Sequence, residues 1–294
     1  MTVPVPLLNA NEDRVTLVTL AVTDGDVVRT GDRLATVETS KATADIVAPC
    51  RGVVRGVKVT DGAELKVGST LCTIEESEPV EAMPDHPEIG RYRAVVIGGG
   101  RHAACVLDAL GGSGFDVIGC LDDVKMIGFE VIPGAKVIDR IDHFDDLCHD
   151  SLGVFIGVGG ATDNEPRAKL FDRLARAGAT FPPLVHRTAH VAPGVILGPG
   201  TVVLANATIG PGCVFGGNTI INQGANVCHH CTIGDHVHLA PGSILAGGCR
   251  IGTGSTVGMA ATVFIDVEIG RWCLVDNGVA VTNNLADRTH LTHK

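Results

Sequence analysis

Aromatic side chains and an excess of positive charge are the two features that this sequence most clearly lacks. Phe, Trp and Tyr make up 3% of the 294 residues, whereas glycine occurs 38 times, so tight turns and small side chains are expected in place of a bulky aromatic core. The formal net charge is -10, which argues against a nucleic-acid partner because such a surface needs clustered Lys and Arg. A nucleotide ligand is still allowed, since backbone amides bind phosphates.

Signals for membrane insertion and secretion are also missing. No apolar run approaches the length of a membrane span, and the first residues, MTVPVPLLNANEDR, contain no basic segment followed by an apolar one. We therefore expect no membrane partner and a cytoplasmic location. In a reducing compartment the ten cysteines are expected to be small buried side chains.

A period of six residues dominates the C-terminal part of the sequence. An α-helix has a period of 3.6 and a plain strand a period of 2, so neither explains it. Hexapeptide periodicity is typical of a β-solenoid, in which each repeat stacks on its neighbours, and we predict one for residues 183–294. Every sixth position is apolar at Val191, Leu197, Val203, Ile209, Phe215, Ile221, Val227, Ile233, Leu239, Leu245, Ile251, Val257, Val263, Ile269, Val275 and Val281.

Two further domains and a linker precede this repeat. Residues 1–78 contain short Val-, Leu- and Thr-rich runs between Asp-Gly turns, which predicts a compact all-β domain. Residues 79–90 are acidic and proline-rich without periodicity, as linkers are. Residues 91–182 alternate strand-like runs such as RAVVI and GVFIGVG with the helical segment EPRAKLFDRLARAG, which predicts a small α/β, Rossmann-like domain with a parallel sheet.

The α/β domain begins with a strand, a glycine turn and a helix. In RAVVIGGGRHAACVLDAL, Gly98, Gly100 and Ala103 fit the pattern G-x-G-x-x-G/A, in which backbone amides approach a phosphate at a helix N-terminus. Asp122 and Asp123 follow the next strand, where an acid can bind a ribose hydroxyl. A dehydrogenase is the other interpretation of this motif, but about ninety residues are short for a dinucleotide fold and no hydride-transfer site follows.

The segment IINQGANVCHHCTIGDHVHLAPGSILAGG, residues 220–248, resembles the motif of the hexapeptide-repeat acyltransferases. The subgroup is that of sugar acyltransferases similar to sialic acid O-acetyltransferase and the nucleotide-aminosugar N-acetyltransferases, whose GxGGHA motif is similar to GGGRHA in the α/β domain. The resemblance implies that residues 183–294 form a left-handed parallel β-helix and that residues 91–182 bind the nucleotide of the sugar substrate. It also implies a homotrimer.

The same resemblance implies roles for single residues of the β-helix. His229 matches the catalytic histidine, a general base for the incoming amino or hydroxyl group, and Asn222 matches an asparagine of the same pocket. His238 and Gly247 match residues that contact the acyl-CoA, the glycine through its backbone amide.

The position after His229 departs from the family pattern. The family has Asp or Glu there, and commonly Glu before the histidine, whereas this chain has His230 and Cys228. A neighbouring carboxylate would orient the imidazole and raise its pKa. We include His230 among the candidate catalytic residues and expect Asp235 or a backbone carbonyl to take the orienting role.

For the α/β domain, the resemblance implies a nucleotide-sugar site along the glycine turn and the strand ends. Arg101 replaces a usual glycine and is expected to contact the diphosphate. The other candidates are Gly98, Gly100, His102, Asp122, Asp123 and the turn that begins at Gly157.

A zinc site is the main competing interpretation of Cys228-His-His-Cys231, because thiols and imidazoles are zinc ligands. Successive side chains of a strand point to opposite faces, however, so these four would not converge on one ion. The γ-class carbonic anhydrases bind zinc on a similar β-helix, but they have a further histidine where this chain has Ala225. We therefore predict no metal.

Residues 3–74 resemble a lipoyl domain, the swinging-arm carrier of 2-oxoacid dehydrogenases. The resemblance rests on VTDGDVVRTGDRLATVETSKATADIVAPCRGVV and on VTDGAELKVGSTLCTI, which repeats it. ETSKA stands where the family has ETDKA, so Lys41 is the candidate for lipoylation and Ser40 replaces the usual Asp. A lipoylated arm implies a lipoyl ligase and an E1-like 2-oxoacid dehydrogenase as partners, whereas an unmodified domain would serve in docking or solubility.

Together these features predict an enzyme that moves an acyl group, expected to be acetyl, from an acyl-CoA such as acetyl-CoA to an amino or hydroxyl group of a nucleotide-linked sugar. Two alternatives are left open by the sequence. An acyl-dihydrolipoyl arm on Lys41 could be the donor, or the β-helix could serve only to trimerise a non-catalytic lipoyl carrier.

Overall fold

The computed structural model describes residues 1–9, 12–23, 26–28, 31–40, 42–50, 52–76, 92–147, 152–160 and 162–293. It contains two compact units, Met1–Ala82 and Met83–Lys294. The candidate lysine Lys41 and the predicted linker, residues 79–90, lie outside the described residues. In the described part of the chain, none of the helices combines the length and the apolar character needed to cross a membrane.

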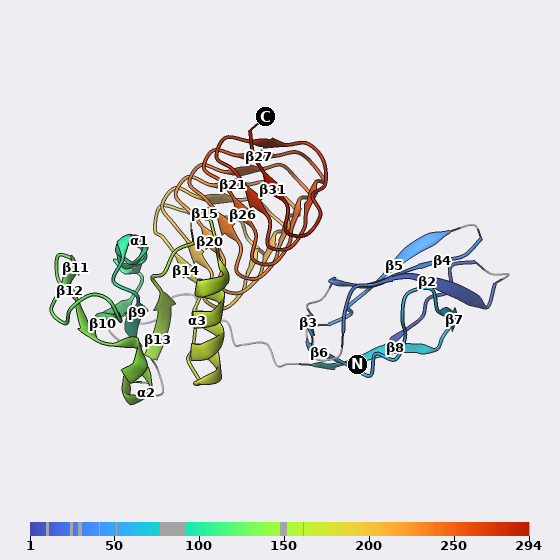
Figure 1. Ribbon diagram of the computed structural model, residues 1–294, viewed down its shortest axis with the longest axis horizontal. Helices are drawn as coiled ribbons and strands as arrows, with labels where there is room; N and C mark the ends of the chain where they lie inside the picture. The colour runs from blue at the N-terminus through green and yellow to red at the C-terminus, as the bar shows by residue number, and fades with distance from the viewer. Residues whose placement is uncertain are drawn as a thin grey trace. The chain divides into compact units, whose positions relative to one another are not determined.

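The first unit consists of two four-stranded antiparallel sheets, with strand orders β1-β8-β6-β3 and β5-β4-β2-β7 (Figure 1). Successive side chains of a strand point to opposite faces, so in β2 Val15 and Leu17 are buried while Arg14 and Thr16 are exposed. Buried residues of both sheets form one core, which confirms the predicted all-β fold. The strands are β1 (Thr2–Pro4), β2 (Arg14–Leu20), β3 (Val27–Val28), β4 (Arg33–Glu38), β5 (Thr43–Val47), β6 (Gly52–Arg55), β7 (Glu64–Lys66) and β8 (Thr70–Glu76).

The second unit begins with an α/β domain around a sheet of order β11-β12-β10-β9-β13. Strands β12, β10, β9 and β13 are parallel, as predicted. Strand β11 pairs antiparallel with β12, a hairpin that the sequence analysis did not predict. The elements are β9 (Tyr92–Ile97), α1 (Arg101–Leu110), β10 (Phe115–Leu121), β11 (Glu130–Ile132), β12 (Ala135–Asp139), the 3-10 helix η1 (Ile141–His143), α2 (Phe144–Leu147), β13 (Leu152–Ile156) and α3 (Glu165–Arg176).

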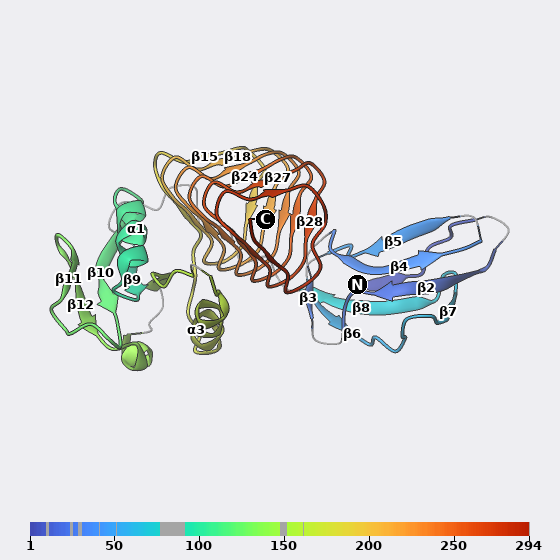
Figure 2. The same cartoon turned by 45° about the horizontal axis from the view of Figure 1, so that its top comes forward.

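A left-handed parallel β-helix, seen nearly along its axis in Figure 2, forms the rest of this unit. Its two-residue strands make three parallel sheets. The first face has the order β14-β17-β20-β23-β26-β29-β31, the second face β15-β18-β21-β24-β27-β30, and the third face β16-β19-β22-β25-β28. The strands are β14 (Leu184–Val185), β15 (His190–Val191), β16 (Ile196–Leu197), β17 (Val202–Val203), β18 (Thr208–Ile209), β19 (Val214–Phe215), β20 (Ile220–Ile221), β21 (Asn226–Val227), β22 (Thr232–Ile233), β23 (His238–Leu239), β24 (Ile244–Leu245), β25 (Arg250–Ile251), β26 (Thr256–Val257), β27 (Thr262–Val263), β28 (Glu268–Ile269), β29 (Leu274–Val275), β30 (Ala280–Val281) and β31 (His290–Leu291).

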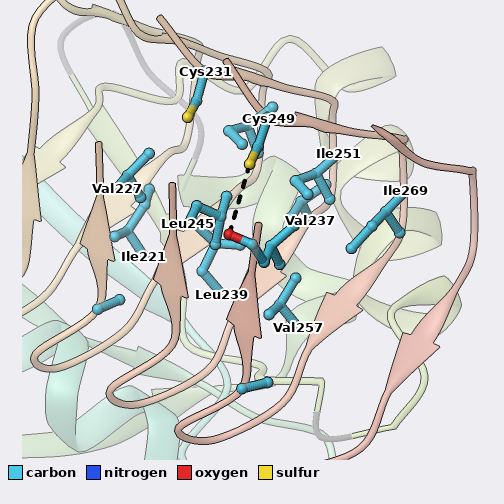
Figure 3. Packing of buried hydrophobic residues seen from close by; sticks show 14 of the residues in the cluster. Ile221, Val227, Cys231, Val237, Leu239, Leu245, Cys249, Ile251, Val257 and Ile269 are labelled. Carbon is cyan, nitrogen blue, oxygen red and sulfur yellow. Dashed lines mark hydrogen bonds between the residues drawn. The ribbon is translucent and has the colours of Figure 1, made fainter. Parts of the chain in front are cut away.

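The period-six residues fill the interior of these coils. Each is the second residue of its strand and points inward, as Figure 3 shows for Ile221, Leu239 and Val257. All except the first two positions, Val191 and Leu197, are at most 2% exposed, because each coil is covered by the next. The described cysteines form no disulfide, and several of them pack into the same interior.

Candidate active site

The candidate residues of the β-helix lie on two opposite sides of it. His229 and His230 belong to the turn between β21 and β22, the corner where the second and third faces meet. His238 lies in β23 on the first face, and Asn222 follows β20 at the edge of that face. In a three-sided coil, this corner is opposite the first face. One chain therefore does not bring His229 together with His238 and Asn222.

The imidazole of His229 lies flat against Gly247 on the next coil. Residues 18 apart occupy equivalent places on neighbouring coils, as the pairing of Thr208 with Asn226 shows. A Cβ atom on Gly247 would lie 2.4 Å from Cε1 of His229, 2.8 Å from Nε2 and 3.0 Å from Nδ1. Only a residue without a side chain leaves room for the ring, so Gly247 fixes where His229 lies.

His230 contacts His229 through the ring nitrogens. The two Nδ1 atoms are 3.1 Å apart, and the rings meet edge to face at an interplanar angle of 76°. Both side chains are exposed at the corner. Asp235, one of the two groups proposed to orient His229, accepts a hydrogen bond from the Gly217 amide at 2.6 Å.

His238 is buried and has both ring nitrogens engaged. Its Nδ1 donates to the carbonyl oxygen of Gly160 in the α/β domain, and its Nε2 lies 3.1 Å from Nδ2 of Asn222. A carbonyl only accepts, so Nδ1 carries the proton and Nε2 accepts from the amide. Burial is the main reason that the pKa of His238 falls to about 4; the Gly160 bond opposes the change, and the charge of Arg167 adds to it. His238 is therefore a neutral ring at physiological pH.

His102 lies at the start of α1, on the α/β side of the same contact. Its Nε2 atom is buried and has no hydrogen-bond partner among the described residues. Burial, followed by the nearby His238 and Arg167, lowers its pKa to about 4. A neutral ring with one unpaired nitrogen at a helix N-terminus is suited to a polar ligand group.

The glycine turn that precedes α1 packs closely against the turn after β13. A Cβ on Gly157 would lie 2.7 Å from the Cβ of Ala103, which explains the small residue at the third position of the motif. Gly98 has a φ of +103°, a conformation that other residues rarely adopt. Gly100 is the N-cap of α1 and makes no side-chain cap, and Arg101 is exposed beside it. The first residues of the N-terminus of α1, Gly100 and Arg101, are thus accessible from solvent.

Asp122 and Asp123 hold the loop beyond β10. Oδ2 of Asp122 accepts from the Gly99 amide at 2.6 Å, and Oδ1 accepts from Val124 at 2.7 Å and Lys125 at 2.6 Å. Burial alone would raise the pKa of Asp122, but these bonds outweigh it and lower the pKa. Oδ1 of Asp123 accepts from the Ile141 amide at 3.0 Å. The ends of β9 and β10 are thereby tied together beside the glycine turn.

Two buried side chains fasten the α/β domain onto the first face. Nδ2 of Asn164 donates to the carbonyl oxygen of Gly254 at 3.0 Å and to Oγ1 of Thr256 at 2.9 Å. The guanidinium of Arg167, in α3, donates to the carbonyl oxygens of Asn218 and His236 at two successive corners. Both side chains are only 1% exposed, so the position of this domain on the β-helix is fixed.

The interpretation of Cys228-His-His-Cys231 as a zinc site can be compared with the geometry of the corner. Within the described ranges, no three His, Cys, Asp or Glu side chains are placed to hold a metal ion. Cys231 is fully buried inside the coil, whereas His229 and His230 are exposed on the outside, so the suspected zinc ligands do not converge.

Comparison with known proteins assigns the chain to a family. Residues 2–74 match the model of the biotin-requiring enzymes, and residues 93–174 match that of the PglD N-terminal domain. No curated protein gives a significant match. Among solved structures, a point mutant of GDP-perosamine N-acetyltransferase from Caulobacter crescentus, in complex with CoA and GDP-perosamine, is 31% identical, with a TM-score of 0.63 over 69% of this chain and 95% of that one. The chain belongs to the hexapeptide-repeat sugar acyltransferases.

Two further solved structures have a similar fold. The acetyltransferase domain of PglB from Neisseria gonorrhoeae, in complex with acetyl coenzyme A, is 28% identical, with a TM-score of 0.62 over 68% of this chain and 96% of that one. WeeI from Acinetobacter baumannii, at 21% identity and a TM-score of 0.55 over 67% of this chain and 94% of that one, shares the fold. The first unit of this acyltransferase matches the separate biotin- and lipoyl-type model.

Asn164 and Arg167, which anchor the α/β domain of this acyltransferase, carry no signal in the sequence. An arginine in an amphipathic helix is normally solvated, and nothing local marks Arg167 as buried. Asn164 directly precedes α3 and looks like an ordinary N-cap, yet its side chain makes no cap hydrogen bond and contacts the β-helix instead. Only the contact between the domains reveals these roles.

Proposed function

We propose that this protein transfers the acetyl group of acetyl-CoA to the amino group of a nucleotide-linked sugar, with His229 as the general base. The observation that carries the proposal is the exposed His229 imidazole held flat against Gly247. Such a ring is fixed in place but open to two substrates. The ligands named for similar structures, acetyl-CoA for the PglB domain and CoA with GDP-perosamine for the Caulobacter enzyme, support the donor and the class of acceptor.

The reaction needs no covalent enzyme intermediate, because CoA is already a good leaving group. The sugar nitrogen attacks the thioester carbonyl while Nε2 of His229 takes its proton. The backbone amide of Gly247, in contact with the same ring, is the candidate donor to the oxyanion. Collapse of the tetrahedral intermediate expels the CoA thiolate, which receives the proton from Nε2. The products are the N-acetyl sugar and CoA.

The nucleotide part of the acceptor would bind on the α/β domain. The exposed N-terminus of α1 at Gly100 and Arg101 is suited to the diphosphate, and the next residue, His102, is a further candidate to contact the nucleotide. Asp122 and Asp123 support this surface by fixing the loop after β10.

A second copy of the chain would complete the site. The α/β domain covers the first face through Arg167 and Asn164, whereas His229 lies at the opposite corner. A sugar held by one chain could therefore reach His229 only on a neighbouring chain. This geometry supports the trimer that the resemblance to the family implies, with His238 and Asn222 contributed from the other side of the interface.

Thiol release tests the proposal directly. Acetyl-CoA is incubated with a panel of UDP-, dTDP- and GDP-linked amino sugars, and free CoA is measured with a thiol reagent. We expect release with one class of amino sugar, its loss in His229→Ala, and normal release in the control His190→Ala, which changes an exposed histidine on the first coil. Turnover by His229→Ala at the wild-type rate would contradict the assignment of the base. Equal release with the corresponding hydroxy sugars would redirect the proposal to O-acetylation.

A further inference from the structure

The contact between His229 and His230 has a consequence for proton placement. Two neutral imidazoles joined through their Nδ1 atoms at 3.1 Å need one proton between them, so one ring donates and the other accepts. If His230 donated, His229 would carry its proton on Nε2 and have no lone pair toward the substrates. If His229 donates, its Nε2 is free to accept a proton. Only the second arrangement is competent as a base.

We propose that His230 is a positioning residue that accepts the Nδ1 hydrogen of His229 as a neutral imidazole, in the place where a carboxylate would serve. This inference rests on the proposed role of His229. The proton of the sugar nitrogen goes to Nε2 of His229, and the Nδ1 hydrogen stays between the two rings throughout. The resulting imidazolium keeps its hydrogen bond to His230, and no proton passes to His230.

The backbone holds His230 in the orientation that this role requires. His230 has a φ of 57°, a left-handed conformation that is uncommon for residues other than glycine. Its ring lies against Gly212 on the preceding coil, where a Cβ would be 2.8 Å from Cδ2. His229 lies against Gly247 on the following coil. Each ring is thus packed against a glycine of a neighbouring coil. This packing limits the motion of both rings and favours a fixed contact between them.

The contacts described for the pair involve ring nitrogens and glycines, and none of them is to a carboxylate. The Cys213 thiol donates to the Cys228 carbonyl oxygen at 2.9 Å, and the Cys231 thiol donates to the Ala246 carbonyl oxygen at 3.3 Å. Other titratable groups near this corner include Cys228 and Asp235 on the same coil, Cys249 and Arg250 on the following coil, and Asp266 on the coil beyond. Asp235 accepts a hydrogen bond from the Gly217 amide, and Oδ1 of Asp266 is directed toward Gly248. A neutral acceptor holds the ring without the added attraction that raises the pKa of a histidine beside a carboxylate.

Three substitutions of His230 separate this role from a purely structural one. In His230→Asn the side-chain oxygen replaces Nδ1 as an acceptor, and asparagine tolerates the left-handed conformation, as Asn218 does at φ 53° in this chain. In His230→Ala the acceptor is lost, while Ala260 at φ 54° shows that alanine can occupy such a corner. In His230→Asp a charged acceptor is introduced at a conformation that Asp266 already adopts at φ 56°.

The readout is the pH profile of kcat/KM for these variants of the full chain. We expect His230→Asn to stay within about 3-fold of wild type and His230→Ala to lose about 10- to 100-fold in kcat with little change in KM, as for other partners that orient an imidazole. In His230→Asp the midpoint of the acidic limb should rise by about one pH unit, because the carboxylate stabilises the imidazolium. Wild-type kcat and an unchanged profile in His230→Ala would overturn the proposal.

A second measurement is independent of turnover. Nitrogen NMR of protein labelled with ¹⁵N-histidine, with His229→Ala and His230→Ala used for assignment, shows which ring nitrogen carries hydrogen. We expect Nδ1 to be protonated in His229 and unprotonated in His230 at neutral pH. The reverse pattern would overturn the inference even if the enzyme is active. A different outcome is that the enzyme turns over none of the acceptors while Nδ1 is protonated in His229 and unprotonated in His230. That result would contradict the proposed function but not the inferred hydrogen bond from His229 to His230.

Discussion

His238 donates from Nδ1 to the carbonyl oxygen of Gly160, a residue 78 positions earlier in the sequence. The same ring accepts a hydrogen bond from Asn222 through Nε2. This buried imidazole therefore joins the α/β domain to the β-helix and orients Asn222 at the edge of the first face. The bond to Gly160 survives protonation, but Nε2 accepts from Asn222 only while the ring is neutral.

Stability of the second unit should fall as the pH drops toward 4. Burial holds the pKa values of His238 and His102 at about 4 in the folded chain, below the ordinary value of 6.5. Between pH 6.5 and pH 4 the unfolded chain binds protons that the folded chain does not. The free energy of unfolding is therefore highest above about pH 6.5 and decreases as the pH falls below it. At pH 5 the loss amounts to about 2 kcal/mol for each histidine.

Fluorescence of Trp272, the single tryptophan of the chain, follows unfolding of this unit. In His238→Gln, which can still donate and accept but does not titrate, the loss of stability between pH 7.5 and 5 should be about half that of wild type. An equal loss in both proteins would show that His238 does not titrate in this range.

Gly247→Ala should reduce activity without unfolding the coil. The added Cβ would lie 2.4 Å from Cε1 of His229, so the ring must move, and we expect kcat/KM to fall about 10- to 100-fold because the base is displaced. Gly194→Ala, at the same corner with open space around it but a φ of +79°, is the matched control. It should cost about 1 kcal/mol of stability and leave turnover unchanged, and the opposite pattern would refute the prediction.

Arg167→Met should destabilise the contact between the α/β domain and the β-helix. The substitution leaves the buried carbonyl oxygens of Asn218 and His236 and the amide oxygen of Asn164 without their donor, and we expect a loss of about 2–5 kcal/mol. Lys169→Met, on the same helix at a side chain that is 77% exposed, should change stability by less than about 0.5 kcal/mol. Denaturant unfolding monitored at Trp272 compares the two, and equal stabilities would contradict the anchoring role.

Mixed assemblies should reveal a site shared between chains. His229→Ala and His102→Ala are each expected to be inactive, because one lacks the base and the other a contact for the nucleotide. If each site takes these residues from two neighbouring chains, random mixing after refolding together leaves about a quarter of the sites intact. We expect about a quarter of the wild-type thiol release from the mixture. No recovery would place both residues of a site on one chain.

The sequence alone determined the parts of this molecule that depend on local repetition. Each turn of the β-helix repeats the same short pattern, so the inward residues from Val203 to Val281 could be identified without any long-range information. The first strands and helices of the α/β domain followed from alternating apolar runs for the same reason. The hairpin of β11 and β12 did not, because its short strands have no strong period.

The tertiary structure decided where the candidate residues lie relative to one another. The motif around His229 also contains His238, and the sequence suggested one common pocket, yet half a coil separates them and places them on opposite sides. The orienting partner of His229 is its neighbour His230, which no pattern of acids predicted. Burial of Arg167 and the neutral state of His238 likewise depend on contacts between residues far apart in the chain, and such contacts exist only once the α/β domain packs onto the first face.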